Sequence, residues 1–474
     1  MHKVYYILLI CLLAGALFPC RAQSPVIAQP LQVVSDDGYI VVRHILVSGN
    51  KKTRTSIILR EIGTVPGDTI RLKELSATLE SRRKQLLNTS LFLNVTANVK
   101  NWTGNDADIE FEVWERWYTF AFPIFKLADR NFNQWLVEQK GSLDRVNIGV
   151  KVFQDNLTGR NDEIKADLQI GYTQRLMLSY DLPYIDKRYR HGAGIIFSYS
   201  RNREVNDSSN ENKQHFFRQD DFLRRNFSAG LSYTYRRAIN TKQQVYLTYN
   251  EESVSDSVVF MNPEYLGDGR KKVRFLNLLY RITYANADSW TFPLKGVYLQ
   301  AEVEKTGIGP LSDIDYIRFR VRAAKYWQLF PKTYGALGIR AQAKLSDDQP
   351  YFAQKAMGYG EDYLRGYEYY VVDGTSFAIF KSTLRQELLN MKVRLPMVPR
   401  KFSQLPIRIF AKTYADAGYT YSRYPGNGFL NNRMLYSGGA GFELVTFYDT
   451  SIRFEYSVNQ LGEKGLFLHA KLDM

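Results

Sequence analysis

The chain has 474 residues, a formal net charge of +15 and 14% aromatic residues. Its mean hydropathy is −0.33. Beyond residue 22, no apolar stretch approaches the roughly 20 residues that a membrane-spanning helix needs, which excludes a helical membrane protein. A transmembrane β-barrel remains compatible with these numbers, because its apolar residues alternate with polar ones along each strand and lower the mean hydropathy.

Residues 1–22 have the pattern of a secretory signal peptide, with one lysine, a long apolar run and small residues before a cut at Gln23. Cys20 leaves a lipoprotein as an alternative, although the phenylalanine and proline before it suit lipid attachment poorly. The cut would also remove Cys11, so the mature chain would have no disulfide and no thiolate metal site. For an exported chain, the positive charge favours anionic lipid head groups and acidic glycans over nucleic acid.

Residues 38–116, which follow a short linker over residues 23–37, have the pattern of one compact α+β domain. A β-branched run at residues 40–47 predicts a strand, and Thr53 is expected to cap the helix that follows. Leucines spaced by three, four and seven residues predict a second helix over residues 72–86. Two alternating strands complete the order β-α-α-β-β, and we expect them at residues 92–99 and 109–113.

This order, with Gly49-Asn50 after the first strand and Phe92-Leu93-Asn94-Val95 opening the second, resembles a POTRA domain. A small sheet with an open edge can accept an extended client segment as an added strand. We therefore predict client binding along the strand that carries Phe92, Val95 and Val99. The alternative is a domain that serves only as a spacer or a barrel plug.

The remaining residues, 117–474, contain many segments of about ten residues in which apolar and polar residues alternate, as at residues 145–152 and 297–304. Lipid outside and water inside a barrel explain this pattern. The predicted fold class is an α+β domain followed by an all-β transmembrane barrel. A large soluble sheet is the alternative, but such sheets rarely have so many strands. We expect the polar stretches 202–218 and 251–272 to be long extracellular loops.

Two neighbouring predicted strands carry opposite charges on the face that would line the barrel. Arg318, Arg320 and Arg322 lie on one strand, and Glu302 and Glu304 lie on the strand before it. An unpaired charge inside a dry lumen costs several kcal/mol. We therefore expect these arginines to pair with these glutamates.

Four stretches of the barrel region resemble the BamA/TamA family of outer-membrane assembly factors, the bacterial surface antigen barrels. They are MLSYDLPY at residues 177–184, WTFPLKGVYL at 290–299, LRGY at 364–367 and YADAG at 414–418. The resemblance implies a barrel of about 16 antiparallel strands in the cell outer membrane of a Gram-negative-type bacterium. It also implies that the POTRA domain lies in the periplasm.

The resemblance further implies a latch, in which a long extracellular loop folds back into the barrel lumen. Arg365 of the LRGY stretch is expected to meet Asp416 of the YADAG stretch. A guanidinium and a carboxylate can form a bidentate, charge-assisted contact. Gly366 would permit the close backbone approach, and Tyr367 and Gly418 would complete the contact surface.

A lateral gate, at which the first and last barrel strands pair weakly, is the other feature that the resemblance implies. We place it at Trp117 and Phe120 near the first strand and at Phe467 and Leu468 on the last. Unpaired backbone groups in hydrocarbon cost several kcal/mol each, so an insertase must offer an edge that pairs with its client.

The functional hypothesis is a factor that inserts or translocates outer-membrane proteins. Its expected partners are unfolded polypeptides, outer-membrane lipids and lipopolysaccharide, with accessory lipoproteins as further candidates and no nucleic acid. A two-partner-secretion-type export pore and a passive porin are the alternatives. An enzyme is not expected, because the chain has no Gly-x-Ser-x-Gly elbow and its five histidines show no metal-ligand spacing. We therefore expect no catalytic residue, metal or cofactor.

Overall fold

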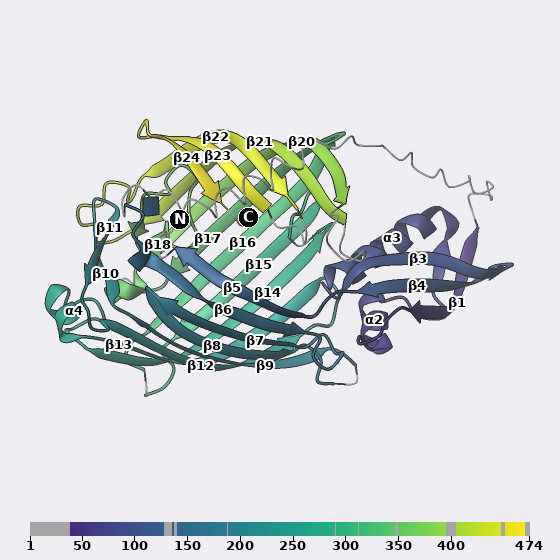
Figure 1. The fold of residues 1–474 in the computed structure, drawn as a ribbon, viewed down its shortest axis with the longest axis horizontal. Helices are drawn as coiled ribbons and strands as arrows, with labels where there is room; N and C mark the ends of the chain where they lie inside the picture. Colours follow the sequence, from purple (N-terminus) through teal and green to yellow (C-terminus); the bar gives the residue numbers. More distant parts are fainter. Residues whose placement is uncertain are drawn as a thin grey trace.

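The computed structural model describes residues 38–127, 135–136, 140–186, 188–289, 291–310, 312–346, 349–394, 404–446 and 451–469. A small N-terminal domain lies beside one end of a large barrel (Figure 1). The expected signal peptide and linker lie outside the described residues. Among the described residues, no helix is long and apolar enough to cross a membrane.

The N-terminal domain pairs two helices with a four-stranded sheet. Its elements are β1 (Tyr39–Ser48), α2 (Thr55–Ile62), β2 (Thr69–Arg71), α3 (Leu72–Asn88), β3 (Phe92–Thr103) and β4 (Asp106–Glu115). The strand order is β2-β1-β4-β3, with β1 parallel to β4 and β3 antiparallel to it. The two helices and three of the strands were predicted. Strand β2 was missed because three residues are too few to show alternation.

Both helices pack their apolar residues against one face of this sheet. The fully buried members of this core include Ile40, Val42, Ile57, Ile58, Ile62, Leu86, Phe92, Val95, Ile109 and Phe111. Helix α2 ends at Gly63, whose φ of 66° is a left-handed conformation that glycine adopts without strain.

The connection from β1 to α2 is held by the end of β4. The Glu115 carboxylate accepts hydrogen bonds from the backbone N–H of Thr53 at 2.6 Å and of Lys52 at 3.0 Å. The prediction that Thr53 caps α2 is wrong. Arg54 stands at the cap position without a side-chain hydrogen bond, and the Thr53 hydroxyl lies 2.9 Å from that of Tyr118.

Glu115 should give this domain a pH-dependent stability. Burial alone would raise its pKa, but the N–H groups of Thr53 and Lys52 outweigh burial and hold the pKa below its usual value. The carboxylate therefore stabilises the fold above the pKa of the unfolded chain, and this contribution disappears as the pH falls through the lower folded pKa. We expect Glu115→Gln to lower the domain's free energy of unfolding by about 1–3 kcal/mol near neutral pH and by far less below about pH 4.

Urea unfolding of the full-length protein in detergent micelles, followed by tryptophan fluorescence, measures this difference. Glu112→Gln is the matched control, because Glu112 is an exposed carboxylate on the same strand. An equal loss for both variants, or a loss that does not change with pH, would contradict the assignment.

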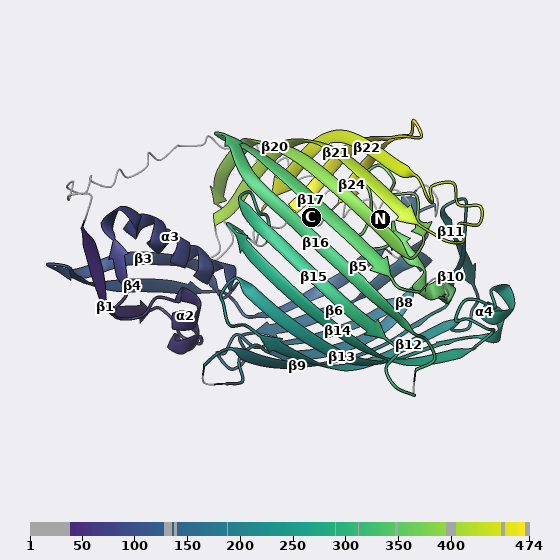
Figure 2. The ribbon, with the colours of Figure 1, turned by 180° about the vertical axis from the view of Figure 1, so that it is seen from behind.

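The second part of the molecule is one sheet of 16 strands. In chain order the strands are β5 (Thr119–Leu127), β6 (Val146–Asp155), β7 (Glu163–Gly171), β8 (Thr173–Leu182), β9 (His191–Asn202), β12 (Arg224–Tyr235), β13 (Thr241–Val254), β14 (Lys272–Ala287), β15 (Gly296–Thr306), β16 (Tyr316–Phe330), β17 (Thr333–Lys344), β20 (Ser376–Arg394), β21 (Gln404–Tyr421), β22 (Met434–Val445), β23 (Ser451–Asn459) and β24 (Lys464–His469). Each strand pairs antiparallel with the next one in this order, and the sheet curves round a lumen (Figures 1 and 2). The predicted fold class is confirmed.

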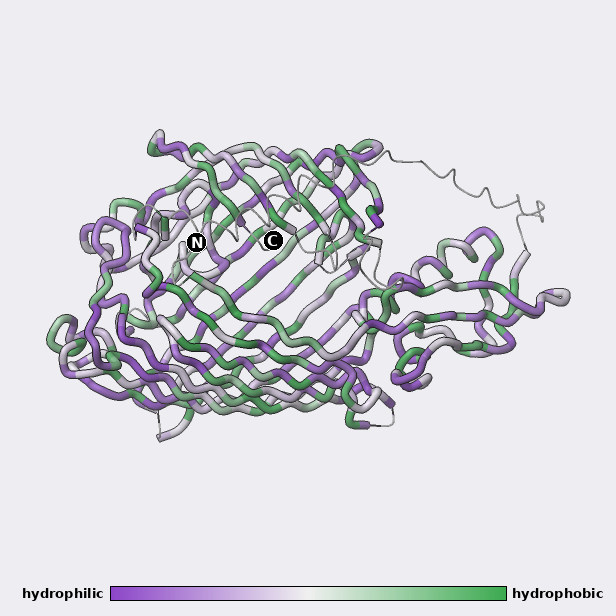
Figure 3. The backbone as a smooth tube through the Cα atoms, viewed as in Figure 1, coloured by the Kyte–Doolittle hydropathy of each residue, from purple (hydrophilic) through white to green (hydrophobic). Residues whose placement is uncertain are grey.

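Apolar side chains point outward from the barrel and charged ones point into the lumen. On β15, for example, Val303 is 41% exposed, whereas its neighbours Glu302 and Glu304 are 6% and 5% exposed. Figure 3 shows hydrophobic and hydrophilic residues alternating along many of the barrel strands. The outer surface can therefore face hydrocarbon while the lumen holds the charges.

The predicted charge pairs between β15 and β16 are only partly present. Arg318 pairs with Glu304, as expected from their positions opposite each other in the ladder. Arg320 and Arg322 instead lie 3.8 and 3.7 Å from the carboxylate of Asp362, which enters the lumen on the loop after β17. The prediction considered strand neighbours alone, and a loop inside the barrel supplied another partner.

Smaller elements lie between the barrel strands. They are η3 (Leu143–Arg145), the hairpin β10 (Glu204–Asn210) and β11 (Lys213–Arg218), α4 (Asp256–Met261), η4 (Tyr351–Ala353), β18 (Lys355–Met357) and β19 (Val372–Asp373). Strands β10 and β11 and helix α4 lie at the barrel end away from the N-terminal domain (Figure 1). The predicted loops 202–218 and 251–272 therefore need correction. The first contains the hairpin of β10 and β11, and the second contains the end of β13 and the helix α4. Their polar composition did not indicate this regular structure.

Candidate functional site: the latch, the seam and the domain junction

The loop between β17 and β20 folds into the lumen and places Arg365 against the barrel wall. The Arg365 side chain is fully buried, and its Nε donates to Asp416 Oδ2 at 2.7 Å while Nη2 donates to Oδ1. Nη1 also donates to the Thr383 hydroxyl and Nη2 to the Ser382 carbonyl, both at 3.1 Å. The guanidinium lies 4.0 Å from the centre of the Tyr414 ring. The structure thus brings the two predicted latch residues together in a bidentate contact.

The other predicted latch residues lie around this ion pair. Gly366 has a φ of 85°, and a Cβ there would come within 3.3 Å of side chains on β22 and β23. Tyr367 is 3% exposed, and its hydroxyl donates to the Tyr436 carbonyl at 3.3 Å. Gly418 on β21 faces Leu364, which a Cβ at Gly418 would meet at 3.4 Å. The two glycines let the loop approach the wall closely, and Tyr367 anchors it there.

A charge network on the wall extends the latch toward the last strands. Lys412 on β21 donates to Glu443 at 3.0 Å and also pairs with Glu455 on β23. Arg385 donates to Glu443 at 2.6 Å. All of these side chains are nearly or fully buried. Local sequence patterns could not predict this network, because its members lie on separate strands whose register is set by the whole barrel.

Strands β5 and β24 stand at the two ends of the 16-stranded order, and no ladder joins them among the residues that the structure describes. We call the boundary between these two strands the seam. Strand β5 contains Pro123, and proline is accepted in edge strands because one side of an edge strand lacks a ladder partner.

The four residues predicted for a lateral gate all lie at or near the seam. Trp117 precedes β5 and is 60% exposed, and the ring of Phe120 packs 5.1 Å from that of Phe153. On β24, Leu468 is 39% exposed, whereas Phe467 is 3% exposed and contacts the latch-loop ring of Tyr369 at 5.7 Å.

The predicted client-binding side chains on β3 need correction. Strand β3 is at the edge of its sheet, as expected, but Phe92 and Val95 are no more than 1% exposed and belong to the domain core. Val99 is partly buried against the same core. Alternation places these apolar residues under the helices, so only the backbone of β3 and its outward side chains can meet a client.

A buried cluster joins the N-terminal domain to the barrel, and the sequence did not reveal it. Arg236, in the turn after β12, donates to the Glu61 carboxylate of α2 at 2.6 and 2.9 Å and to the Tyr184 hydroxyl at 2.7 Å. That hydroxyl donates to Glu61 at 2.5 Å, and burial raises the pKa of Tyr184 so that it remains a donor. A glutamate on the apolar stripe of α2, four residues after Ile57, was the one available clue.

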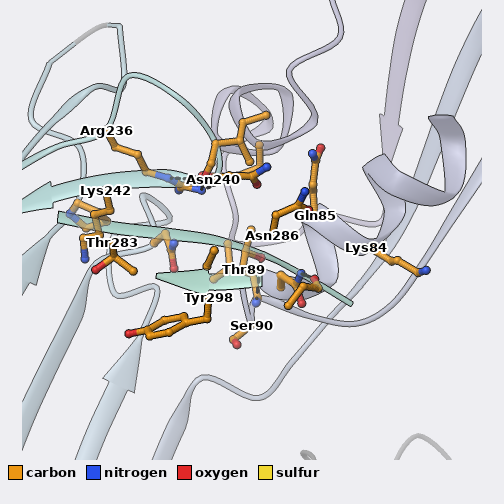
Figure 4. A pocket seen from close by; sticks show the side chains of 18 of the residues that line it. Lys84, Gln85, Thr89, Ser90, Arg236, Asn240, Lys242, Thr283, Asn286 and Tyr298 are labelled. Atoms are coloured by element: carbon orange, nitrogen blue, oxygen red, sulfur yellow. Dashed lines mark hydrogen bonds and ion pairs between the residues drawn. The ribbon is translucent and has the colours of Figure 1, made fainter. Parts of the chain in front are cut away.

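Beside this cluster lies a cavity of about 980 Å³ between α3 and the inner wall of the barrel. Figure 4 shows Lys84 and Gln85 of α3 on one side and Lys242, Thr283 and Tyr298 of the barrel strands on the other. The lining carries both signs of charge and many amide and hydroxyl groups. The cavity therefore connects the domain surface to the wall of the lumen. No group of His, Cys, Asp or Glu side chains suited to a metal ion occurs in the described residues.

The family follows from comparison of the chain with family models. The model of the Omp85 superfamily domain matches residues 156–464, which is more than half of the chain. The chain belongs to the Omp85 superfamily. The model of the surface antigen variable number repeat, a POTRA repeat, matches residues 40–116. Omp85 barrels are outer-membrane proteins that act in assembly or transport, and the resemblance seen in the sequence is confirmed.

Solved Omp85-type structures share this fold. BamA from Haemophilus ducreyi lacking POTRA domains 1–3 is 16% identical with a TM-score of 0.53, covering 90% of this chain and 83% of that one. CdiB from Escherichia coli is 11% identical with a TM-score of 0.51, covering 94% and 91%. CdiB from Acinetobacter baumannii is 12% identical with a TM-score of 0.50, covering 91% and 73%. No curated protein sequence matches the chain.

Loss of one latch charge should destabilise the Omp85 barrel. Breaking a buried pair leaves the other charge uncompensated, so we expect Arg365→Ala to cost about 3–5 kcal/mol. Arg365→Lys should recover only part of this, because an ammonium cannot form the bidentate contact. Urea midpoints from heat-modifiable gel mobility, together with protease cleavage within residues 345–375, report the effect.

The control is Arg274→Ala on β14, whose side chain is 54% exposed and pairs with Glu251 at the surface. Such a pair contributes at most about 1 kcal/mol. If Arg365→Ala has the same urea midpoint and the same protease resistance as this control, the structural role of Arg365 is contradicted.

Proposed function

We propose that this protein inserts client polypeptides into the outer membrane, with residues 38–116 as a periplasmic POTRA domain and residues 117–474 as the barrel. The POTRA domain receives unfolded client segments at the edge of β3. The barrel passes them into lipid at the seam between β5 and β24. Outer-membrane lipids and lipopolysaccharide surround the barrel, and accessory lipoproteins are further candidate partners.

The seam is the observation that carries this proposal. A transmembrane sheet must pair all of its backbone groups, because each unpaired group in hydrocarbon costs several kcal/mol. Strand β24 is described over Lys464–His469, and no ladder joins it to β5 among the described residues. An incoming client strand can pair with such an edge and thereby leave water with its hydrogen bonds formed.

The latch loop supports the proposal because it contacts the last strand directly. The ring of Tyr363 stacks on that of His469 at 5.3 Å, and Glu368 lies 3.4 Å from the same imidazole. The loop carrying Arg365 therefore holds β24 from inside the lumen. In this mechanism, movement of β24 away from the loop opens the seam, while the Arg365 contact keeps the rest of the wall in place.

A polypeptide export pore of the two-partner-secretion type is the second candidate function. The cavity beside α3 favours it, since that cavity leads from the POTRA domain to the lumen wall. The latch loop and its ion pairs occupy the lumen, and a passive porin has no use for them. Export would require the loop to leave the lumen, whereas insertion at the seam would not.

Reconstitution into liposomes separates the two candidates. An unfolded outer-membrane protein is diluted from urea onto proteoliposomes, and its folding is followed by heat-modifiable gel mobility. We expect the wild-type protein to accelerate folding by at least about tenfold, a decrease of about 1.4 kcal/mol in the barrier. Arg365→Ala and deletion of residues 38–116 should lose most of this acceleration.

Arg274→Ala again serves as the control and should behave like the wild type. Background folding rates with the wild-type protein, combined with a large ion conductance through the proteoliposomes, would instead support export through the lumen.

A further inference from the structure

Two arginines face outward at the barrel end that lies away from the POTRA domain. Strands β9 and β12 both meet the β10–β11 hairpin at that end (Figure 1). Ile195 lies opposite Leu231 in their ladder, and the two side chains are 59% and 61% exposed on the outer surface. An even number of positions separates this pair from the pair of Arg201 and Arg225, so all four side chains share the outer face.

The ring of Phe222 gathers further positive charge at this place, and we call Arg201, Arg203, Arg225 and Phe222 the rim cluster. The guanidinium carbons of Arg201 and Arg203 lie 3.9 and 4.9 Å from the centre of the Phe222 ring. Arg201 Nε also donates to the Gln174 side chain at 2.8 Å. Arg203 and Arg225 are exposed. The aromatic ring therefore holds two guanidinium groups within one small area of the surface.

The rim cluster has no carboxylate counterion among the described residues. None of its three arginines forms an ion pair there, and neither do Asp220 and Asp221 in the loop before β12. Neighbouring cations on the outer face are neutralised within the protein, since Lys272 and Arg274 pair with Glu251 at 2.6 and 3.3 Å. The rim cluster therefore presents positive charge that is available to an anion from outside the protein.

Aromatic side chains lie next to the rim cluster on the same outer face. Phe227 stands two positions from Arg225, about 7 Å along the strand. Its ring lies 5.5 Å from that of Phe197 and 6.2 Å from that of Tyr249. Aromatic girdles mark the level at which hydrocarbon gives way to lipid head groups. The rim cluster therefore lies at the level of the head groups, beyond the girdle.

We propose that the rim cluster binds the phosphate groups of lipopolysaccharide in the outer leaflet of the outer membrane. This inference rests on the orientation in the proposed function, in which the POTRA domain lies in the periplasm. It does not require that the protein inserts clients. Guanidinium groups donate paired, charge-assisted hydrogen bonds to phosphate oxygens, which a single ammonium group cannot do.

The number and position of the charges favour lipopolysaccharide over a phospholipid. The lipid A part of lipopolysaccharide carries phosphates on a two-sugar head group, whereas phosphatidylglycerol carries a single phosphate. Three guanidinium groups can neutralise more than one phosphate, and the acyl chains of the same molecule can lie against the apolar outer face of β9 and β12. The cluster and the apolar rows thus form one continuous surface for a single lipid molecule.

Binding of lipid A to the full-length protein in detergent micelles, measured by native mass spectrometry over a series of lipid concentrations, tests the site. We expect the triple variant Arg201→Gln, Arg203→Gln and Arg225→Gln to lose at least about tenfold in affinity, because each guanidinium supplies charge-assisted hydrogen bonds. The corresponding triple lysine variant should recover part of the affinity, because it keeps the charge and loses the fork. Heat-modifiable mobility verifies that every barrel is folded.

Arg274→Gln is the matched control, because it removes a positive charge from the same outer face, and it should bind lipid A like the wild type. Lipid A that lacks one phosphate should bind the wild-type protein more weakly and the triple glutamine variant no differently. Inorganic phosphate in large molar excess should displace little lipid A. Equal affinities of the wild type and the triple glutamine variant, or displacement of lipid A by inorganic phosphate, would overturn the inference.

The binding experiment contains no client, so failure of this inference and failure of the proposed function are distinguishable. If the wild-type protein accelerates client folding but the rim variants bind lipid A unchanged, the inference is wrong and the proposed function stands. If the rim variants lose lipid A but the wild-type protein does not accelerate folding, the proposed function alone is overturned.

Discussion

The requirement that a membrane-embedded backbone pair all of its hydrogen-bonding groups governs this structure. Fifteen of the sixteen strand boundaries that a closed barrel of 16 strands requires are formed by antiparallel ladders, and the boundary between β5 and β24 has none among the described residues. The features that distinguish this barrel gather round that boundary. Pro123 lies on one side of it, the latch loop contacts the other side, and the POTRA domain connects directly to β5.

Charge burial explains why the latch loop stays in the lumen. A loop with few, shallow apolar contacts could leave the lumen with little loss of stabilising free energy. Here Arg365 is fully buried against Asp416, and the Asp362 carboxylate offsets Arg320 and Arg322 of the wall. Removing the loop would take the only described ion-pair partner from the buried Asp416 carboxylate of the wall, which is more costly than losing a surface ion pair. The loop therefore forms part of the wall's electrostatic structure.

The amino-acid sequence predicted features that arise from local pattern. Period-two alternation identified the barrel strands, and the Arg-Gly and Asp-x-Gly motifs identified the two residues that meet as Arg365 and Asp416. Contacts between distant segments could not be predicted from the sequence, because they depend on strand register across the barrel and on how the POTRA domain docks on it. Glu61 lies 175 residues from Arg236, and the pairing of Arg320 with a loop carboxylate depends on a fold that alternation alone does not specify. Alternation along β3 already indicated that Phe92 and Val95 face the domain core, but the two residues were predicted to bind the client instead.

The position of the buried cluster of Glu61, Arg236 and Tyr184 determines which part of the molecule can move. The ion pair and hydrogen bonds on α2 fix the POTRA domain to the turns after β8 and β12, on the side away from the free edge of β3. Swinging this domain would break a buried charge pair, whereas moving β24 breaks its ladder to β23 and contacts with one loop. In the proposed insertion mechanism, opening therefore begins at β24, and β5 remains the fixed edge because the POTRA domain holds its start. A client strand added to β5 would then meet an edge that keeps its geometry while the opposite side of the seam moves.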